Sequence, residues 1–195
     1  MPLKTFDEYV TLAEAAHGHM CAGQILGLRL AIHGMELLGI DDPTGKDRKR
    51  LVSFVEIDRC ATDAVTVVTG CRMGKRALKF RDFGKVAVTF CDLERDRAVR
   101  VVAKDSSKQR AKEVYPEIED KNQQQMKAYR DLPVVDMFEH AWVRVKLAPE
   151  EMPGFKGAKV SCAQCGEGIN FKREVEVDGR TLCKACAGER YYEVL

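Results

Sequence analysis

The chain has 195 residues, 45% hydrophobic and 32% charged, which is enough apolar material for a buried core in one medium domain plus a small appendage. Its 32 basic and 30 acidic residues leave a formal charge of +2, which excludes a broad nucleic-acid-binding surface unless positive charge is strongly localised. Residues 25–40 are interrupted by Arg29, His33 and Glu36, and residues 1–14 lack an apolar signal segment. We therefore expect a cytoplasmic protein without membrane contact.

Two consecutive helices are predicted at the start of the chain. Residues 6–16 follow Thr5, and Glu8 stands three residues after that threonine, which is the pattern of a capping box. Residues 21–38 have the apolar period of a longer helix, and their Gly-x-x-x-Gly spacing from Gly23 leaves a flat surface. Such a surface in a water-exposed protein indicates close packing against another backbone.

The junction between these helices carries His17, His19 and Cys21 within five positions. Two imidazoles and a thiol suit Zn, Ni, Cu or Fe. Gly18 gives the junction the freedom to turn both rings inward, and the positive end of the second helix favours the thiolate of Cys21. The alternative is that the rings are ordinary surface or core side chains. We predict a transition-metal site here, with zinc or nickel as candidates.

Strands and helices alternate over the next hundred residues. We expect strands at residues 51–57, 98–102 and 138–147, a hairpin over residues 78–90 that turns near residues 82–84, a helix at residues 61–68, and a helical segment at residues 106–129 that Pro116 splits. Strands of mostly antiparallel type beside helices indicate an α+β fold with a mainly antiparallel sheet.

Three further cysteines of the first half compete for a place in the metal site. Cys60 lies at a strand-to-helix turn, a frequent location of reactive groups, and Cys71 closes the short helix that follows, so each is a candidate ligand or nucleophile. Cys91 ends an apolar strand and is expected in the core. Asp63 either orients a metal ligand or caps the helix, and both interpretations stay open.

Residues 72–85 contain six basic side chains and one acidic side chain, Asp82, which gives a local charge of +5. Next to a thiol and metal site, Lys85 and its basic neighbours could hold a small anionic substrate such as a carboxylate or a phosphate. The alternative is a solvated hairpin. We count Lys85 with Cys60, Asp63 and Cys71 as candidate catalytic residues.

The last 34 residues carry four cysteines in the spacing C-x2-C-x17-C-x2-C, namely Cys162, Cys165, Cys183 and Cys186. This spacing predicts a structural zinc site with four thiolate ligands, and a segment this short needs such a metal in place of a core. Asp178-Gly179 predicts a hairpin turn, and a short helix is expected after Cys183. The tight turn at the first cysteine pair, the hairpin and the helix together resemble a treble-clef zinc finger. The alternatives to a zinc site are a redox dithiol or two disulfides.

Residues 149–157 combine two prolines and two glycines and predict a linker. We therefore divide the chain into a core domain at residues 1–152 and a zinc finger at residues 158–195. Residues 159–195 hold six basic and six acidic side chains, and zinc with four thiolates adds negative charge. The finger is thus poorly matched to nucleic acid, and a structural or protein-contact role is expected.

Four motifs of the first half occur together, in this order: His17-Gly-His-Met-Cys21-Ala-Gly23, Cys60-Ala-Thr-Asp63-Ala, Thr69-Gly-Cys71-Arg-Met-Gly74-Lys75 and Phe83-Gly-Lys85-Val-Ala-Val-Thr-Phe90. They resemble the FmdE-like family, whose members are named after formylmethanofuran dehydrogenase operons. The resemblance implies an α+β core that forms a homodimer, with a metal-containing active site near the first motif. Some members also carry a treble-clef finger.

Three functions fit these observations. The first is an enzyme or accessory subunit of one-carbon or redox metabolism, related to formylmethanofuran dehydrogenase, with an open metal site and a small anionic substrate. The second is a metal-handling or assembly factor for a molybdenum or tungsten enzyme. The third is a regulatory module whose zinc finger contacts a protein partner.

Overall fold

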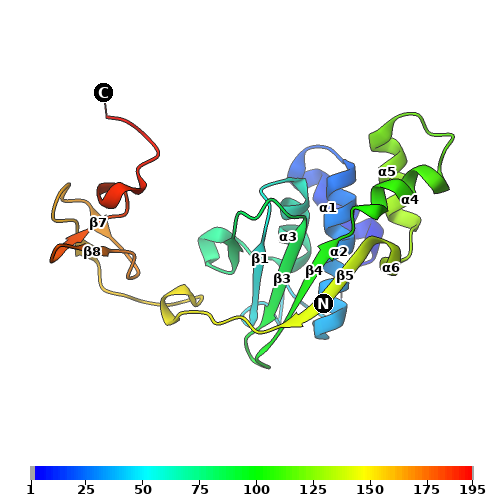
Figure 1. Cartoon of the computed structure of the whole chain (residues 1–195). Helices are drawn as coiled ribbons and strands as arrows, with labels where there is room; N and C mark the ends of the chain where they lie inside the picture. Colours follow the sequence, from blue (N-terminus) through cyan, green and yellow to red (C-terminus); the bar gives the residue numbers. More distant parts are fainter. Residues whose placement is uncertain (1–2, 195) are drawn as a thin grey trace. The chain divides into compact units, whose positions relative to one another are not determined.

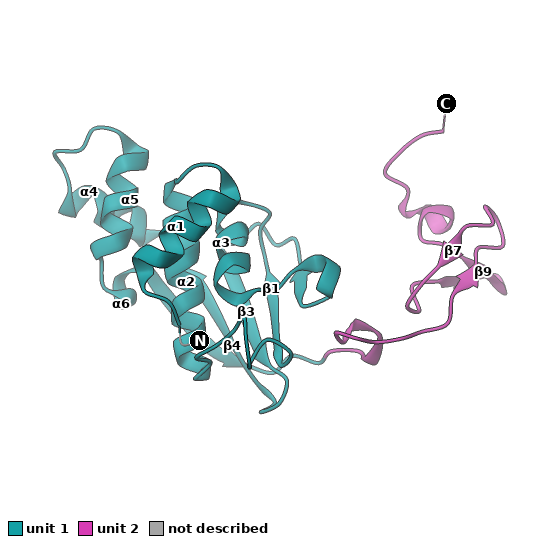
Figure 2. Ribbon diagram, turned by 180° about the vertical axis from the view of Figure 1, so that it is seen from behind, with its two compact units in different colours: residues 1–146 teal, residues 147–195 magenta. Residues whose placement is uncertain are grey.

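A computed structural model describes residues 3–194 of the chain (Figure 1). The chain divides into two compact units, residues 1–146 and residues 147–195 (Figure 2). Each unit has its own helices or strands and its own cluster of buried residues. No helix among residues 3–194 combines the length and the apolar character that crossing a membrane requires.

The first unit opens with the two predicted helices, α1 (Phe6–His17) and α2 (Ala22–Leu38). The predicted capping box is present, because the N–H of Glu8 donates to Thr5 Oγ1 at 3.3 Å and the N–H of Thr5 donates to Glu8 Oε2 at 2.8 Å. Helix α1 ends at Gly18, whose φ of +90° lies in the left-handed region. Cys21 is the N-cap of α2, so the chain reverses within a few residues.

A five-stranded sheet has the order β2-β1-β3-β4-β5. Its strands are β1 (Leu51–Val55), β2 (Leu78–Phe80), β3 (Ala87–Asp92), β4 (Arg97–Ala103) and β5 (Phe138–Val143). All neighbouring pairs are antiparallel except β1 and β2, which are parallel. The predicted α+β fold with a mainly antiparallel sheet is confirmed, while β5 ends four residues earlier than predicted.

The hairpin predicted for residues 78–90 is wrong, because β2 and β3 do not pair. They flank β1 on opposite sides, and residues 81–86 cross the end of β1, where the N–H of Arg81 donates to Val55 O and the N–H of Phe83 donates to Glu56 O. Helix α3 (Cys60–Thr69) connects β1 to β2. Parallel pairing of two strands requires such a crossover connection, which a local hairpin pattern cannot reveal.

The remaining helices of the first unit are α4 (Ser106–Val114), α5 (Lys121–Asp131) and α6 (Val134–Met137), and a 3₁₀ turn η1 (Met73–Lys75) follows α3. Pro116 lies between α4 and α5, as predicted. The side chains of α2 are buried along most of its length, and Figure 1 shows α2 against the sheet. Gly34 leaves room there for the Phe90 ring, since a Cβ at this position would lie 2.2 Å from it.

The second unit starts with the turn η2 (Pro149–Glu151) and contains two small sheets. Strand β6 (Val160–Ser161) pairs with β7 (Gly168–Ile169), and β8 (Val175–Val177) pairs with β9 (Arg180–Leu182). The hairpin predicted at Asp178-Gly179 is confirmed, and both of its turn residues have positive φ. A π-helical turn, η3 (Ala185–Glu189), follows.

Candidate functional site

The junction between α1 and α2 gathers three potential metal ligands. His17 is the last residue of α1 and Cys21 is the N-cap of α2, while Gly18 supplies the left-handed backbone between them. The ligand atoms of His17, His19 and Cys21 lie within 4.8 Å of one another, and the centroids of the two imidazole rings are 4.8 Å apart. The structure therefore brings both rings and the thiol to one point, although the junction itself has no regular secondary structure.

The ring of His17 is held in a fixed orientation. Its Nδ1 lies 2.9 Å from Oδ2 of Asp63, which stands in the first turn of α3. Its Nε2 is buried and has no hydrogen-bond partner among the described residues. A carboxylate on one ring nitrogen fixes the tautomer that leaves the other nitrogen as a donor for a metal. The donor set and this buried nitrogen both fit a transition metal.

Cys60 lies beside this group. It begins α3, and the bare α-carbon of Gly23 faces it: a Cβ on Gly23 would be 3.2 Å from Cys60 Cβ and 3.8 Å from Cys21 Sγ. Burial, followed by the neighbouring Cys21 thiol, raises the pKa of Cys60. The side-chain amide of Gln24 donates to the carbonyl of Cys60 at 2.9 Å and ties the start of α3 to α2.

Cys71 is not part of the group. It follows the far end of α3, a helix of 10 residues that is about 14 Å long at 1.5 Å per residue. Its Sγ lies 3.5 Å from Ser53 Oγ and 3.7 Å from the carbonyl oxygen of Leu51, and burial raises its pKa. Cys91 is buried as predicted, and burial raises its pKa to about 12. The structure thus separates these two thiols from Cys21.

The basic segment at residues 72–85 is divided between the two ends of β1. Residues 72–76 follow the far end of α3, whereas the N–H of Lys85 donates to the carbonyl of Glu56 at 3.2 Å, four residues before Cys60. Lys85 is exposed. Only the second half of the segment therefore lies at the end of the sheet from which α3 starts.

A hollow of about 440 Å³ lies next to the junction, since Met20 is one of its lining residues. It lies between α1, the start of α2 and α5, and its apolar floor includes Met20, Ile25 and Met126. Its charged lining residues are Glu14, Lys127 and Arg130. The volume is in the range of small-molecule pockets.

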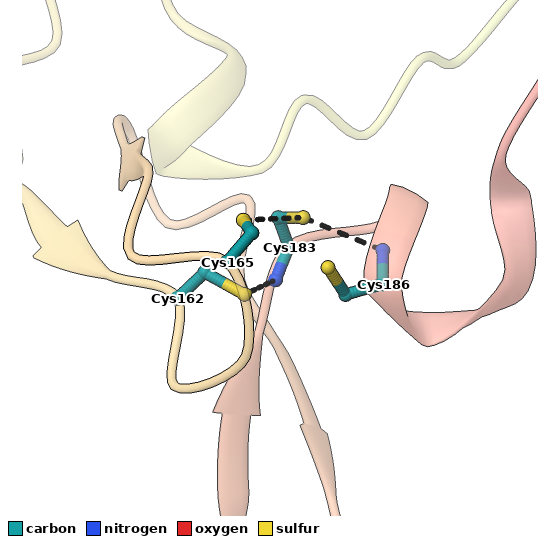
Figure 3. Close-up of side chains that lie close together, drawn as sticks. All are labelled: Cys162, Cys165, Cys183 and Cys186. Atoms are coloured by element: carbon teal, nitrogen blue, oxygen red, sulfur yellow. Dashed lines mark hydrogen bonds between the residues drawn. The ribbon is translucent and has the colours of Figure 1, made fainter. Parts of the chain in front are cut away.

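The four C-terminal cysteines form a second cluster (Figure 3), in which all ligand sulfurs lie within 4.8 Å of one another. Backbone N–H groups point at the thiols: those of Cys183 and Gln164 lie 3.3 and 3.5 Å from Cys162 Sγ, and that of Cys186 lies 3.4 Å from Cys183 Sγ. Backbone donors, chiefly the N–H of Cys165, lower the pKa of Cys162 to about 6. Four converging thiols with backbone donors fit a tetrahedral zinc site.

Comparison with known proteins covers the residues of both clusters. The family described as "FmdE, Molybdenum formylmethanofuran dehydrogenase operon" matches residues 16–151, which include the whole core cluster. The chain belongs to the FmdE family. Residues 157–192 match the prokaryotic dksA/traR C4-type zinc finger, so this FmdE-family protein carries a four-cysteine zinc finger with structural zinc. The treble-clef topology stays a prediction.

Two relatives of this FmdE-family chain extend the comparison. A probable S-adenosyl-L-methionine-binding protein of Archaeoglobus fulgidus is 30% identical over 201 residues, which cover 94% of this chain and 53% of that protein. The chain therefore spans about half the length of this curated relative. The crystal structure of a tungsten formylmethanofuran dehydrogenase FmdE-like protein from Syntrophus aciditrophicus has a TM-score of 0.66 at 22% identity, with 97% of this chain and 96% of that chain covered. This second likeness shows the fold.

One contact at the FmdE core site was not predicted from the sequence. The side-chain Oδ1 of Asn122 accepts a hydrogen bond from the N–H of Ala22 at 3.0 Å and so caps the N-terminus of α2. Cys21, the N-cap residue, has no capping side-chain hydrogen bond, which leaves its sulfur available. The absence of Ser, Thr, Asp or Asn at this N-cap was the only signal that a distant residue supplies the cap.

Proposed function

We propose that this FmdE-family protein binds a transition metal, zinc or nickel, at the α1–α2 junction and acts there on a small anionic substrate of one-carbon or redox metabolism. The observation that carries the proposal is the ring of His17, with Asp63 on Nδ1 and a buried, unpartnered Nε2. A histidine that serves only packing has no need for a fixed ring and a buried free nitrogen. The family membership supports the same metabolic class.

Each residue then has a distinct role. His17, His19 and Cys21 hold the metal, and Asp63 fixes the tautomer and orientation of His17. A metal held by three protein ligands supplies a Lewis acid with an open position. Cys60 stands next to Cys21 as an additional ligand or as a nucleophile, and exposed Lys85 contributes positive charge for an anion near the start of α3.

Metal analysis of the full chain tests the proposal. Purified protein loaded with zinc or nickel is expected to hold two metal equivalents, one in the core and one in the finger. The double variant His17→Ala/Cys21→Ser should hold one. The matched control His140→Ala/Cys91→Ala also removes one imidazole and one thiol, from residues outside both clusters, and should keep two.

Equal metal content in the wild type and the His17→Ala/Cys21→Ser variant would contradict a core metal site. If the variant loses one equivalent, the substrate class is tested next. Formate, phosphate and longer carboxylates are titrated into the metal-loaded protein while the absorption bands of a cobalt or nickel substitute are recorded. An anion that enters the open position changes these bands, and no anion should change them in the variant.

A metal-handling or assembly role is the second candidate, and the exposure of His19 favours it. His17 is partly buried, whereas His19 lies at the surface of the same cluster. A ligand at the surface allows a metal to leave stepwise toward an acceptor. A chelator competition separates the two roles: release of the core metal within minutes indicates handling, whereas retention over hours indicates a catalytic centre.

The finger and the oligomeric state complete the proposal. We propose that the protein is a homodimer and that the zinc finger contacts a protein partner rather than a substrate. Light scattering on the full chain and on a chain truncated after residue 155 tests both statements. A folded, dimeric core without the finger supports an auxiliary role, whereas loss of the dimer would place the finger in the dimer contact.

A further inference from the structure

Two segments that the proposed function does not use, residues 44–50 and 72–76, lie side by side at the end of β1 remote from Cys60. A Cβ on Gly70 would lie 3.2 Å from Cγ2 of Thr44, so the first segment starts beside the residues that precede Arg72. Cys71 Sγ lies 3.7 Å from the carbonyl oxygen of Leu51, so the first segment also ends beside them. We call these two segments the basic loop pair.

The first of these loops separates its charges by sign. Asp42 and Asp47 are buried. The carboxylate of Asp42 accepts hydrogen bonds from the N–H groups of Gly45 at 3.0 Å and Lys46 at 3.1 Å, and Asp47 Oδ2 accepts one from the N–H of Asp42 at 3.1 Å. The buried carboxylates of Asp42 and Asp47 therefore fix the backbone of this loop through hydrogen bonds. The basic side chains of the same loop point to the surface, apart from Arg50, which is partly buried.

Five cations of the basic loop pair are exposed and have no ion-pair partner within residues 3–194: Lys46, Arg48, Lys49, Arg72 and Lys75. Arg50 differs, because it contacts Asp47, Asp92 and Glu94. The pair carries seven basic residues and one acidic residue, a charge of +6, whereas the whole chain carries +2. The rest of the chain is therefore at −4, and the positive charge is concentrated at this end of the sheet.

The chemistry of the surface distinguishes two kinds of partner. Specific protein interfaces have an apolar centre, and the basic loop pair exposes a single large hydrophobic side chain, Met73. Interfaces with nucleic acid are more polar and far more positive. Neither loop contains an aromatic residue on which the bases of a single strand could stack. Both observations favour the phosphate backbone of a duplex.

We propose that the basic loop pair binds the phosphate backbone of a double-stranded nucleic acid without reading its sequence. A chain with a net charge of only +2 can attract a phosphate backbone where its positive charge is concentrated in one place, as it is in the basic loop pair. The proposal is independent of the core metal, since about 9 Å of α3, from Asp63 to Thr69, separates the residue that contacts His17 from the end of the helix beside the pair. Contacts to phosphate alone position a duplex and carry no base recognition.

Fluorescence anisotropy tests the proposal with the full zinc-loaded chain and a fluorescein-labelled 20-base-pair DNA duplex of mixed sequence. Five phosphate contacts predict a slope of log K against log salt of about −4.5, so the affinity should fall roughly 500-fold between 50 and 200 mM salt. An RNA duplex of the same sequence identifies which nucleic acid binds more tightly. Binding of either with this salt dependence supports the proposal.

Two variants of equal charge locate the surface. Lys46→Gln/Arg48→Gln/Lys49→Gln leaves two of the five cations and should reduce the slope to about −1.8, with weaker binding at every salt concentration. The control Lys108→Gln/Lys112→Gln/Lys121→Gln removes three exposed cations from α4 and α5 and should keep the wild-type slope. Far-UV circular dichroism confirms that both variants fold.

Three results would overturn the proposal. The first is absence of duplex binding at 50 mM salt. The second is equal weakening by the two triple variants, because binding would then follow net charge rather than the basic loop pair. The third is displacement of the duplex by a 20-residue polyglutamate peptide at equal concentration, which would identify an acidic protein as the partner.

Discussion

Replacement of Gly27 by alanine tests the contact on which the core site depends. Gly27 lies on the face of α2 that packs against α3, and α3 carries both Cys60 and Asp63. A Cβ at Gly27 would lie 2.6 Å from the carbonyl oxygen and 2.7 Å from the Cα of Ala61. Both of these atoms are backbone, so the contact can be relieved only if α3 as a whole moves away.

The size of the effect follows from two opposing terms. Alanine in place of glycine stabilises a helix interior by about 1 kcal/mol. Overpacking a close contact costs about 1–3 kcal/mol, and the upper part of this range applies because α3 must retreat by roughly 0.8 Å to reach an ordinary contact of 3.4 Å. Gly27→Ala should therefore lower the free energy of unfolding by about 1–2 kcal/mol.

Gly23→Ala is the matched comparison on the same helix. It also gains helix propensity, although Gly23 stands in the first turn of α2. Its Cβ would lie 3.2 Å from the side-chain Cβ of Cys60, which a shift of a few tenths of an ångström relieves, and at ordinary contact distances of 3.8 and 3.9 Å from Cys21 Sγ and the backbone nitrogen of Ala61. Its stability should equal or exceed that of the wild type. Urea denaturation followed by circular dichroism at 222 nm reports on the first unit, which holds the long helices.

The expected difference between the two variants is about 2 kcal/mol, or a melting temperature about 4–8 °C lower for Gly27→Ala. Gly27→Ala should also bind less metal in the core, because the retreat of α3 separates Asp63 from His17. If Gly27→Ala is as stable as Gly23→Ala, the close approach of α2 and α3 is refuted, and with it the placement of Cys60 beside Cys21.

Three further outcomes are expected. Iodoacetamide at pH 8 should leave Cys91 unmodified until urea unfolds the protein, because burial raises its pKa to about 12; mass spectrometry of native protein that shows rapid labelling would contradict this. Cys165→Ser should lose one zinc equivalent by elemental analysis while the helical signal of the first unit is retained. Burial lowers the pKa of His33 in the folded protein, so the unfolded chain binds a proton at this imidazole first as the pH falls through 6.5, and the free energy of unfolding decreases. His33→Gln should therefore reduce the pH dependence of the urea midpoint between pH 7 and pH 5. An unchanged pH dependence would contradict this prediction.

The zinc finger and the helices could be predicted from the sequence because their signals are local. The C-x2-C spacing and the Asp178-Gly179 turn each act over a few residues, and the capping box at Thr5 acts over one turn. The pairing of β2 was predicted wrongly, because the apolar pattern of a short strand specifies its faces but not its neighbour. The partner of a strand is set by the tertiary crossover through α3.

In the core site, too, contacts within one short segment could be predicted from the sequence, whereas contacts between distant segments could not. Three donors of one short segment could be predicted as a group, and the structure brings them within 4.8 Å. The two interpretations of Asp63 could not be separated, because its partner is 46 residues away and is reached only when α1 and α3 pack together. Cys71 was grouped with Cys60 on residue type, although a helix of 10 residues places them at opposite ends.

The two clusters differ in a way that assigns them different chemistry. The finger offers four sulfur ligands, which complete a tetrahedral zinc site and leave no position for another molecule. The core cluster offers three ligands of mixed type, and a carboxylate outside the cluster orients one ring. A metal in the finger can therefore only stabilise the fold, whereas a metal in the core would have a free coordination position for another molecule. For this reason the stoichiometry of the His17→Ala/Cys21→Ser variant bears on function, and that of Cys165→Ser bears on stability.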